Sequence, residues 1–261
     1  MVINKRYKTI ILGVSILVLL EAIAIIFLLV SRPKKPAKVS IPVKGRIAII
    51  LDDWGYNLDN LRILDQMRYP FTASVLPKVA YSRTVALELH KRGAEVMLHL
   101  PMEPFEGIGL EKNTIMVSTG EQDIIKIIGQ DLADIHYAVG VSNHMGSRAT
   151  GDSRVMSIVL NELKRRNLFF VDSFVSSRSV CSALAGKLKI RFAKRDVFLD
   201  DIEDPVYIKG QVDELKKKAR MYGYAVGIGH DRRVTLEVLK ETIPGLVKEG
   251  YKLVFVSKLV K

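Results

Sequence analysis

The chain has 261 residues, of which 48% are apolar and 26% charged, so it can bury a core and is not a disordered protein. Its single cysteine, Cys181, excludes an internal disulfide framework and a cysteine-rich zinc site. The net charge is +12, but residues 1–46 hold nine basic residues and one acid, whereas the remainder holds 31 and 27. A basic stem beside anionic lipid explains this distribution, and no nucleic-acid partner is expected.

The first element along the chain is an apolar run. Thr9 to Val30 is 22 residues long with Glu21 as its one ionisable side chain, and as a helix it would span about 33 Å. No small-residue cleavage site follows it, so we expect an uncleaved membrane anchor, although the flanking cations do not decide its orientation. The sequence predicts a basic N-terminal segment, an anchor, a Pro/Lys-rich linker and one domain, at residues 1–8, 9–30, 31–45 and 46–261.

Beyond the linker, short apolar runs rich in β-branched residues alternate with stretches at helical spacing. This alternation predicts a parallel α/β architecture, either a barrel or an open doubly wound sheet. The predicted helices include 82–93, 152–167 and 234–250. The predicted strands are 47–51, 71–76, 94–98, 138–142, 168–171, 197–199, 225–229 and 252–257.

Acidic or histidine side chains follow six of the eight predicted strands. Ligands of such folds bind where the carboxyl ends of the strands meet, so we expect these side chains to form one active site. Three of the five histidines in the chain occupy such positions. The residues that follow the strands are Asp52-Asp53, His99, Asn143-His144, Asp172-Ser173, Asp200-Asp201 and His230.

The adjacent carboxylates of Asp52 and Asp53 follow a buried run, where they repel each other and lose hydration. A bound cation would offset that cost. Two histidines and a carboxylate are a recurring ligand set for a catalytic divalent metal, which polarises a carbonyl and acidifies water. With a carboxylate as general base and a histidine as general acid, the pattern indicates metal-assisted hydrolysis of an amide or ester.

Seven motifs, in order, resemble the divergent polysaccharide deacetylase family, a distant branch of the NodB-like carbohydrate deacetylases. The resemblance runs from about Arg46 to the end of the chain. It implies a distorted parallel (β/α) barrel that removes N- or O-acetyl groups from an envelope glycan. That substrate places the domain on the periplasmic or extracytoplasmic side of the cytoplasmic membrane. The motifs are IAIILDDWGYN, FTASVLP, EVMLHLPMEP, GVSNHMGS, FFVDS, FLDD and GIGH followed by TLEVL.

The resemblance also implies roles for individual residues. Asp52 matches the family's general base and Asp53 its metal ligand. His99 falls where related deacetylases place a metal histidine, and His230 resembles their general-acid histidine. The expected cofactor is one divalent metal, with zinc as the first choice.

The chain departs from the family pattern at one ligand. Related deacetylases place a second histidine one helical turn after the first, where this chain has Glu103. His144 is the expected replacement, and Glu103 is the alternative. Arg148 lies near the place of the family's substrate-binding arginine, without a clean match to that motif.

Further polar and aromatic residues are candidates for substrate or supporting contacts. Asn143 would orient His144 or bind substrate, and Asp172 would orient His230, bind substrate or cap the local backbone. Asp200 is a weaker candidate. Trp54 would form a sugar-stacking rim or pack in the core.

Two other functions are compatible with the same residues. The domain could be a non-catalytic envelope module that kept the deacetylase fold and binds a glycan or a protein. It could also be a metal-dependent hydrolase of a peptide or phosphate ester, although the near-balanced charge of the domain argues against a strongly basic phosphatase groove.

Overall fold

The computed structural model describes residues 5–31 and 42–261, and the chain divides into two compact units, 1–41 and 42–261. In the first unit, helix α1 (Lys5–Val30) contains the apolar window Ile10–Leu28, with a mean hydropathy of 2.9. By length and composition α1 is a candidate membrane span. The predicted anchor lies within α1, whereas most of the predicted linker lies outside the described residues.

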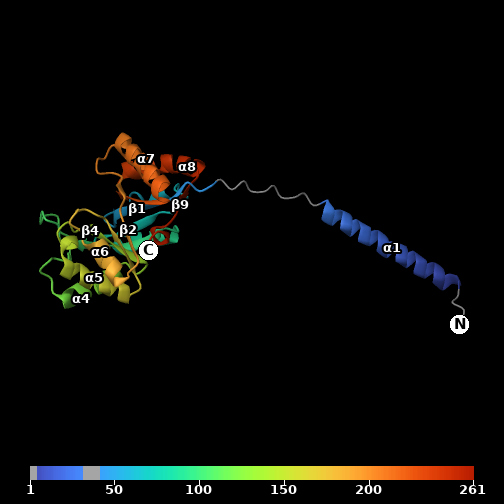
Figure 1. Cartoon of the computed structure of the whole chain (residues 1–261), viewed down its shortest axis with the longest axis horizontal. Coiled ribbons are helices and arrows are strands. Elements are labelled where there is room, and N and C mark those ends of the chain that lie inside the picture. Colours follow the sequence, from blue (N-terminus) through green and yellow to red (C-terminus); the bar gives the residue numbers. More distant parts are fainter. Residues whose placement is uncertain (1–4, 32–41) are drawn as a thin grey trace. The chain divides into compact units, whose positions relative to one another are not determined.

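Within residues 42–261, nine strands form one sheet in which every strand pair is parallel (Figure 1). The order is β6-β5-β4-β3-β2-β1-β8-β7, and β9 pairs with the beginning of β1. The strands are β1 (Gly45–Trp54), β2 (Thr72–Val75), β3 (Glu95–Met102), β4 (Gly140–Met145), β5 (Phe169–Asp172), β6 (Phe192–Lys194), β7 (Val197–Phe198), β8 (Tyr224–His230) and β9 (Tyr251–Leu253).

The sheet curls because its two edge strands, β6 and β7, are successive in the chain. Only Arg195 and Asp196 join them, so the Cα atoms of Lys194 and Val197 are at most about 11 Å apart. No ladder between β6 and β7 closes the described sheet. The fold is therefore a curled half-barrel of parallel strands, which confirms the predicted fold class.

Helices pack around the outside of this sheet. In Figure 1, α4, α5 and α6 lie together on one side, and α7 lies beside α8 on another. The helices are α2 (Leu61–Leu64), α3 (Ser82–Lys91), α4 (Glu121–Asp134), α5 (Ser153–Arg165), α6 (Cys181–Leu188), α7 (Pro205–Tyr222) and α8 (Arg233–Lys248), with 3-10 turns η1 (Ala149–Gly151) and η2 (Val256–Lys258).

Both faces of β1 are buried, which explains its unbroken apolar run. Ile47, Ile49 and Leu51 belong to the larger core cluster, whereas Ala48 and Ile50 belong to a second cluster on the other face. A strand that is covered on both faces needs apolar residues at every position, as parallel sheets usually do. This burial fixes where the run ends and therefore where Asp52 and Asp53 emerge.

The structure differs from the predicted elements chiefly in the number and bounds of its strands. The strand β6 was not predicted, because its three residues make too short an apolar run. The last predicted strand, 252–257, ends at Leu253 and continues into η2. Strands β1, β3 and β4 extend to Trp54, Met102 and Met145, so the candidate residues of these three strands lie within the strands rather than after them.

Candidate metal centre

A β-bulge at the end of β1 turns two successive carboxylates toward one site. Leu51 pairs with Ala73 and Trp54 pairs with Val75, so that Asp52 and Asp53 together lie opposite the single residue between Ala73 and Val75. Asp53 has a φ of 64°, in the left-handed region. In a regular strand the two side chains would point to opposite faces, and the bulge removes this alternation.

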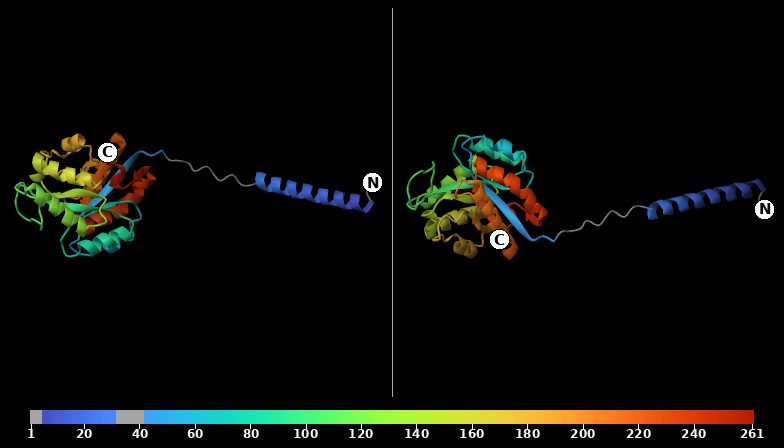
Figure 2. Two further views of the ribbon diagram at one scale, coloured as in Figure 1. Left: turned by 90° about the horizontal axis from the view of Figure 1, so that it is seen from below. Right: turned by 90° about the horizontal axis from the view of Figure 1, so that it is seen from above.

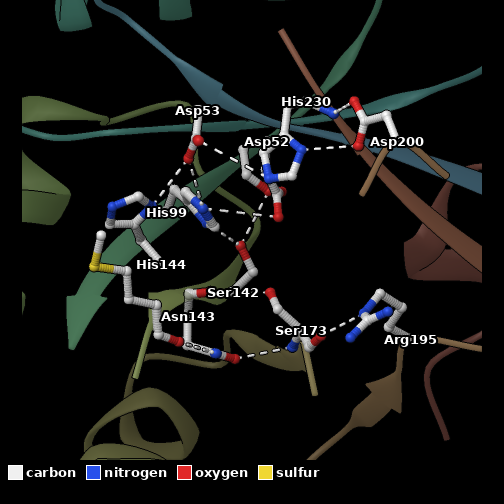
Figure 3. A network of polar contacts seen from close by, with 12 residues as sticks. Asp52, Asp53, His99, Ser142, Asn143, His144, Ser173, Arg195, Asp200 and His230 are labelled. Carbon is white, nitrogen blue, oxygen red and sulfur yellow. Dashed lines mark hydrogen bonds and ion pairs between the residues drawn. The ribbon is translucent and has the colours of Figure 1, made fainter. Parts of the chain in front are cut away.

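Asp53, His99 and His144 form a group that could hold a metal ion. The Asp53 Oδ1 atom lies 2.9 Å from His144 Nδ1 and 3.2 Å from His99 Nε2 (Figure 3). One ligand atom from each of the three residues lies within 4.8 Å of the others. Two imidazole nitrogens and a carboxylate oxygen suit a catalytic zinc or a similar first-row ion. The residues therefore fit the predicted cofactor.

Buried hydroxyls orient the ring of His99. Its Nδ1 atom lies 2.8 Å from Ser142 Oγ, which donates a hydrogen bond to Ser74 Oγ at 3.0 Å. His99 is only 2% exposed, so this contact fixes the ring and leaves Nε2 directed at Asp53. Such a hydrogen bond on the far nitrogen is a common support of metal-binding histidines.

The two carboxylates have different electrostatic environments. Burial raises the pKa of Asp52, and its Oδ1 atom is buried without a hydrogen-bond partner among the described residues. Burial also acts to raise the pKa of Asp53, but hydrogen bonds with His144 and His99 outweigh it and hold this pKa well below its usual value. Asp53 therefore stays ionised, while Asp52 has a higher affinity for a proton.

His230 faces the same site from the end of β8, and Asp200 holds it. The Nδ1 atom of His230 lies 2.9 Å from Asp200 Oδ1, and its Nε2 atom lies 3.9 Å from Asp53 Oδ2. The backbone N–H of His230 and the hydroxyl of Thr235 both donate to Asp200 Oδ2. Burial acts to lower the pKa of His230, but the hydrogen bond and charge of Asp200 raise it above its usual value. His230 is thereby suited to donate a proton at neutral pH.

Glu103 and Asp172, two of the residues considered from sequence, serve other contacts. Glu103 accepts hydrogen bonds from Arg148 Nη1 at 2.9 Å and from the backbone N–H of Val117, and it is not part of the three-residue group. Asp172 accepts from the backbone N–H of Phe174 and from Ser179, as a local cap. The residue that orients His230 is therefore Asp200, and of the alternatives for Asp172 the structure shows the local cap.

Asn143 and Trp54 also lie in supporting positions. Asn143 donates to the carbonyl of Met145 and accepts from the backbone N–H of Ser173, so it braces the loops that follow β4 and β5. The ring of Trp54 is 1% exposed and packs in the core, which is the second of the two alternatives for this residue. Of the two aromatic residues of the motif, Tyr56 is the one at the surface, with 46% of its area exposed.

Arg195 is a feature of the site that sequence reasoning missed. It donates from Nε to the carbonyl of Ser173 and from Nη2 to that of Phe174 (Figure 3). Its guanidinium also lies 4.4 Å from the ring centre of Phe198, which packs edge-on against His230. Arg195 belongs to the two-residue link between the edge strands β6 and β7. Its place beside the site can be recognised only when the positions of these two strands are known.

A sequence profile of the divergent polysaccharide deacetylases matches residues 49–260. The chain belongs to the divergent polysaccharide deacetylase family. Among the family relatives is the uncharacterized protein YibQ of Escherichia coli K12, which is 35% identical over 209 residues. The match covers 80% of this chain and 66% of YibQ, so the chain spans just under two thirds of that protein.

Solved structures share the fold of this member of the divergent polysaccharide deacetylase family. An uncharacterized protein of Agrobacterium tumefaciens C58, ATU2773, has a TM-score of 0.79 at 22% identity, covering 88% of this chain and 92% of that one. The catalytic domain of a peptidoglycan N-acetylglucosamine deacetylase from Eubacterium rectale has a TM-score of 0.56 at 17% identity, covering 85% and 94%. A mutant of BA3943, a family 4 carbohydrate esterase pseudoenzyme with restored activity, has a TM-score of 0.52 at 17% identity, covering 84% and 68%.

Proposed function

We propose that this protein is a metal-dependent hydrolase that removes acetyl groups from a cell-envelope polysaccharide. The observation that carries the proposal is the convergence of Asp53, His99 and His144 on one point, with Asp52 and His230 beside them. These three residues would hold one divalent ion, for which zinc is our first choice. When bound, such an ion would supply Lewis-acid polarisation of the acetyl carbonyl and a more acidic water.

The residues around the group have complementary proton-transfer roles. Asp52, whose pKa is raised, accepts the proton of the attacking water. His230, whose pKa is raised by Asp200, gives a proton to the departing amine or hydroxyl. Hydrolysis of an amide or ester requires a general base that accepts a proton and a general acid that donates one. The raised pKa values of Asp52 and His230 suit these two roles.

The surroundings of the site support a glycan substrate. A mainly apolar hollow of about 350 Å³ is lined by Pro104, Glu106, Ile108, Met145, Ser147 and Val175. Its lining residue Met145 directly follows the predicted ligand His144 in the chain, so we propose that part of the substrate binds in this hollow. The family membership and the activity named for the E. rectale structure point to the same substrate class.

We further propose that α1 is a single-pass anchor in the cytoplasmic membrane and that residues 42–261 face its periplasmic or extracytoplasmic side. The apolar window of α1 is long enough to cross a bilayer. The orientation follows from the substrate, because an envelope polysaccharide is located outside the cytoplasm.

The first test is a metal analysis, which requires no knowledge of the glycan. Residues 42–261, which form a compact unit with its own core, are purified and their bound metal is determined by elemental mass spectrometry. His99→Ala and His144→Ala are compared with His90→Ala, an exposed histidine on α3 outside the site. We expect about one metal ion per chain in the native domain and in His90→Ala, and loss of the metal in the other two variants.

Release of acetate from acetylated glycans by the metal-loaded domain then completes the test. A domain that takes up no metal, even with zinc supplied, would contradict the hydrolase and favour the non-catalytic binding module. A metal-loaded domain that leaves acetylated glycans intact but cleaves a peptide or phosphate ester would replace the substrate class and keep the metal site.

A further inference from the structure

The end of the sheet opposite the candidate metal centre is covered with basic side chains. We define the basal patch as the seven exposed cations at and near the beginnings of β1, β6 and β8, on β9 and in the last residues of the chain. They are Lys44, Arg46, Lys189, Arg191, Lys252, Lys258 and Lys261. Because all strands are parallel, this end lies a full strand length from the site.

Contacts among these residues show that they form one surface. Arg46 is the register partner of Lys252 and donates a hydrogen bond to the carbonyl of Lys258. The backbone of Lys261 pairs with that of Phe192, the residue that follows Arg191. In both views of Figure 2 the C-terminus lies at the end of the domain where β1 begins.

The charges of the basal patch are not neutralised within the domain. Among residues 42–261, no carboxylate forms an ion pair with any of the seven cations. The neighbouring acids Asp196 and Glu95 accept backbone hydrogen bonds from Val226 and Ser257. The loops at the opposite end of the sheet expose the acids Asp59, Glu106, Asp201, Glu203 and Asp204 together with the cations Lys112, Arg178 and Arg233. The basal patch is therefore a local excess of positive charge on a domain whose total charge is nearly balanced.

The basal patch also surrounds a hollow. A cavity of about 580 Å³ lies between the beginnings of β6 and β8, and its charged lining residues are Lys189, Arg191, Lys194, Lys261 and the single acid Asp196. Lys261 lies 4.5 Å from the ring centre of Tyr224 and donates to its hydroxyl. A concave, cationic surface of this size can receive an anionic headgroup between its side chains.

The covalent chain sets an upper limit on the distance between the end of α1 and the first residue of the basal patch. Helix α1 ends at Val30, and Lys44 follows 14 residues later, so the two Cα atoms are at most about 48 Å apart. If α1 spans a bilayer, Lys44 of the basal patch therefore lies within about 48 Å of the end of that span. A tether of this length gives a high effective concentration of the lipid surface.

We propose that the basal patch binds the surface of an anionic phospholipid membrane. The seven cations of the basal patch, which form no ion pair within residues 42–261, supply the attraction, and their position at the tethered end sets the orientation of the domain. The candidate metal centre then faces away from the bilayer, toward material above the membrane. The inference requires no hydrolase activity, so its failure would leave the proposed function untouched.

The test measures vesicle binding by residues 42–261, without the anchor that would insert by itself. Vesicles contain either phosphatidylglycerol mixed with phosphatidylcholine or phosphatidylcholine alone. We compare the native domain with the triple variant Lys252→Glu, Lys258→Glu, Lys261→Glu. The matched control is Arg62→Glu, Lys112→Glu, Lys126→Glu, which changes the net charge equally but uses exposed cations outside the basal patch.

We expect the native domain and the control to bind the anionic vesicles with affinities within about threefold of each other, and the basal variant to bind at least tenfold more weakly. Binding should fall as salt is raised above about 0.15 M. Equal loss in both variants, binding to neutral vesicles, or tighter binding to a soluble anionic polysaccharide than to the vesicles would each overturn the proposal. If the basal variant is not folded by circular dichroism, Lys258→Gln with Lys261→Gln replaces it.

Discussion

The two ends of the parallel sheet use charge in opposite ways. At the carboxyl end, Asp52, Asp53, His99 and His230 are largely buried, within hydrogen-bonding or ion-pair distance of one another. At the other end, the cations of the basal patch are exposed and form no ion pairs within residues 42–261. The buried groups are held in fixed positions by one another, and their pKa values are shifted. The exposed cations only create a positive electrostatic potential at the surface. In this fold, residues at the carboxyl end of the strands are therefore suited to catalysis, and those at the other end to non-specific electrostatic attraction.

The largest contrast should come from Asp52→Asn, which removes the proposed base but keeps its volume. We expect kcat/KM for acetate release to fall about 100- to 10,000-fold with metal content unchanged. Because burial raises the pKa of Asp52, the neutral residue should leave the unfolding midpoint equal or higher. Lys258→Gln at the opposite end should not change kcat/KM. Loss of metal in Asp52→Asn would instead identify Asp52 as a ligand.

Asp200→Asn should change the pH dependence of the reaction. Activity requires protonated His230, and the charge of Asp200 raises the pKa of that histidine. Removing this charge lowers the pKa, so the alkaline limb of the kcat/KM profile should move to lower pH, with a loss of about 10- to 100-fold at neutral pH. Asp201→Asn, an exposed neighbour, is the control. An alkaline limb that does not move would exclude His230 as the general acid.

Asp231→Asn should show that charge at the carboxyl end reduces stability. Burial raises the pKa of Asp231 from 3.8 to about 6. Between these two pH values the carboxyl group is therefore protonated in the folded protein and ionised in the unfolded chain. The free energy of unfolding therefore falls as pH rises from about 4 to about 6 and stays lower above. An asparagine can still accept the hydrogen bond of Asn60. Urea unfolding should show a gain of about 1–2 kcal/mol at pH 7.5 and none at pH 4.

The smallest effect is expected at the basal end. Lys252→Gln removes one of several like charges without breaking an ion pair within residues 42–261, so it should raise the free energy of unfolding by a few tenths of a kcal/mol. The gain should disappear in about 1 M salt, because screening removes the repulsion. A loss greater than about 1 kcal/mol in urea unfolding would show that Lys252 has a packing role.

The side chains gathered at the site could be predicted because parallel strands bring their ends together. Asp52, Asp53, His99, His144 and His230 each lie at or near the end of an apolar run, and the structure places them in one cluster. The proposed roles remain predictions, because grouping alone does not demonstrate metal binding or catalysis.

The supporting contacts could not be predicted, because they depend on register and loop geometry. Asp172 ends β5 and Asp200 lies just after β7, and only the position of β7 beside β8 decides that Asp200 reaches His230. The bulge in β1 is equally invisible in the sequence, since it arises from pairing with β2. Ser142, which orients His99, is an ordinary residue within a buried strand.

The left-handed backbone at Asp53 also constrains how this site can change over evolutionary time. Besides aspartate, asparagine and glycine are the residues that adopt a φ of 64° most readily, so they are the replacements that the bulge tolerates best. Both lack the carboxylate, and both are a single nucleotide away from an aspartate codon. The substitutions that best preserve this backbone therefore abolish the proposed ligand. A lineage of this fold can lose its chemistry in one mutational step and remain a well-folded binding protein.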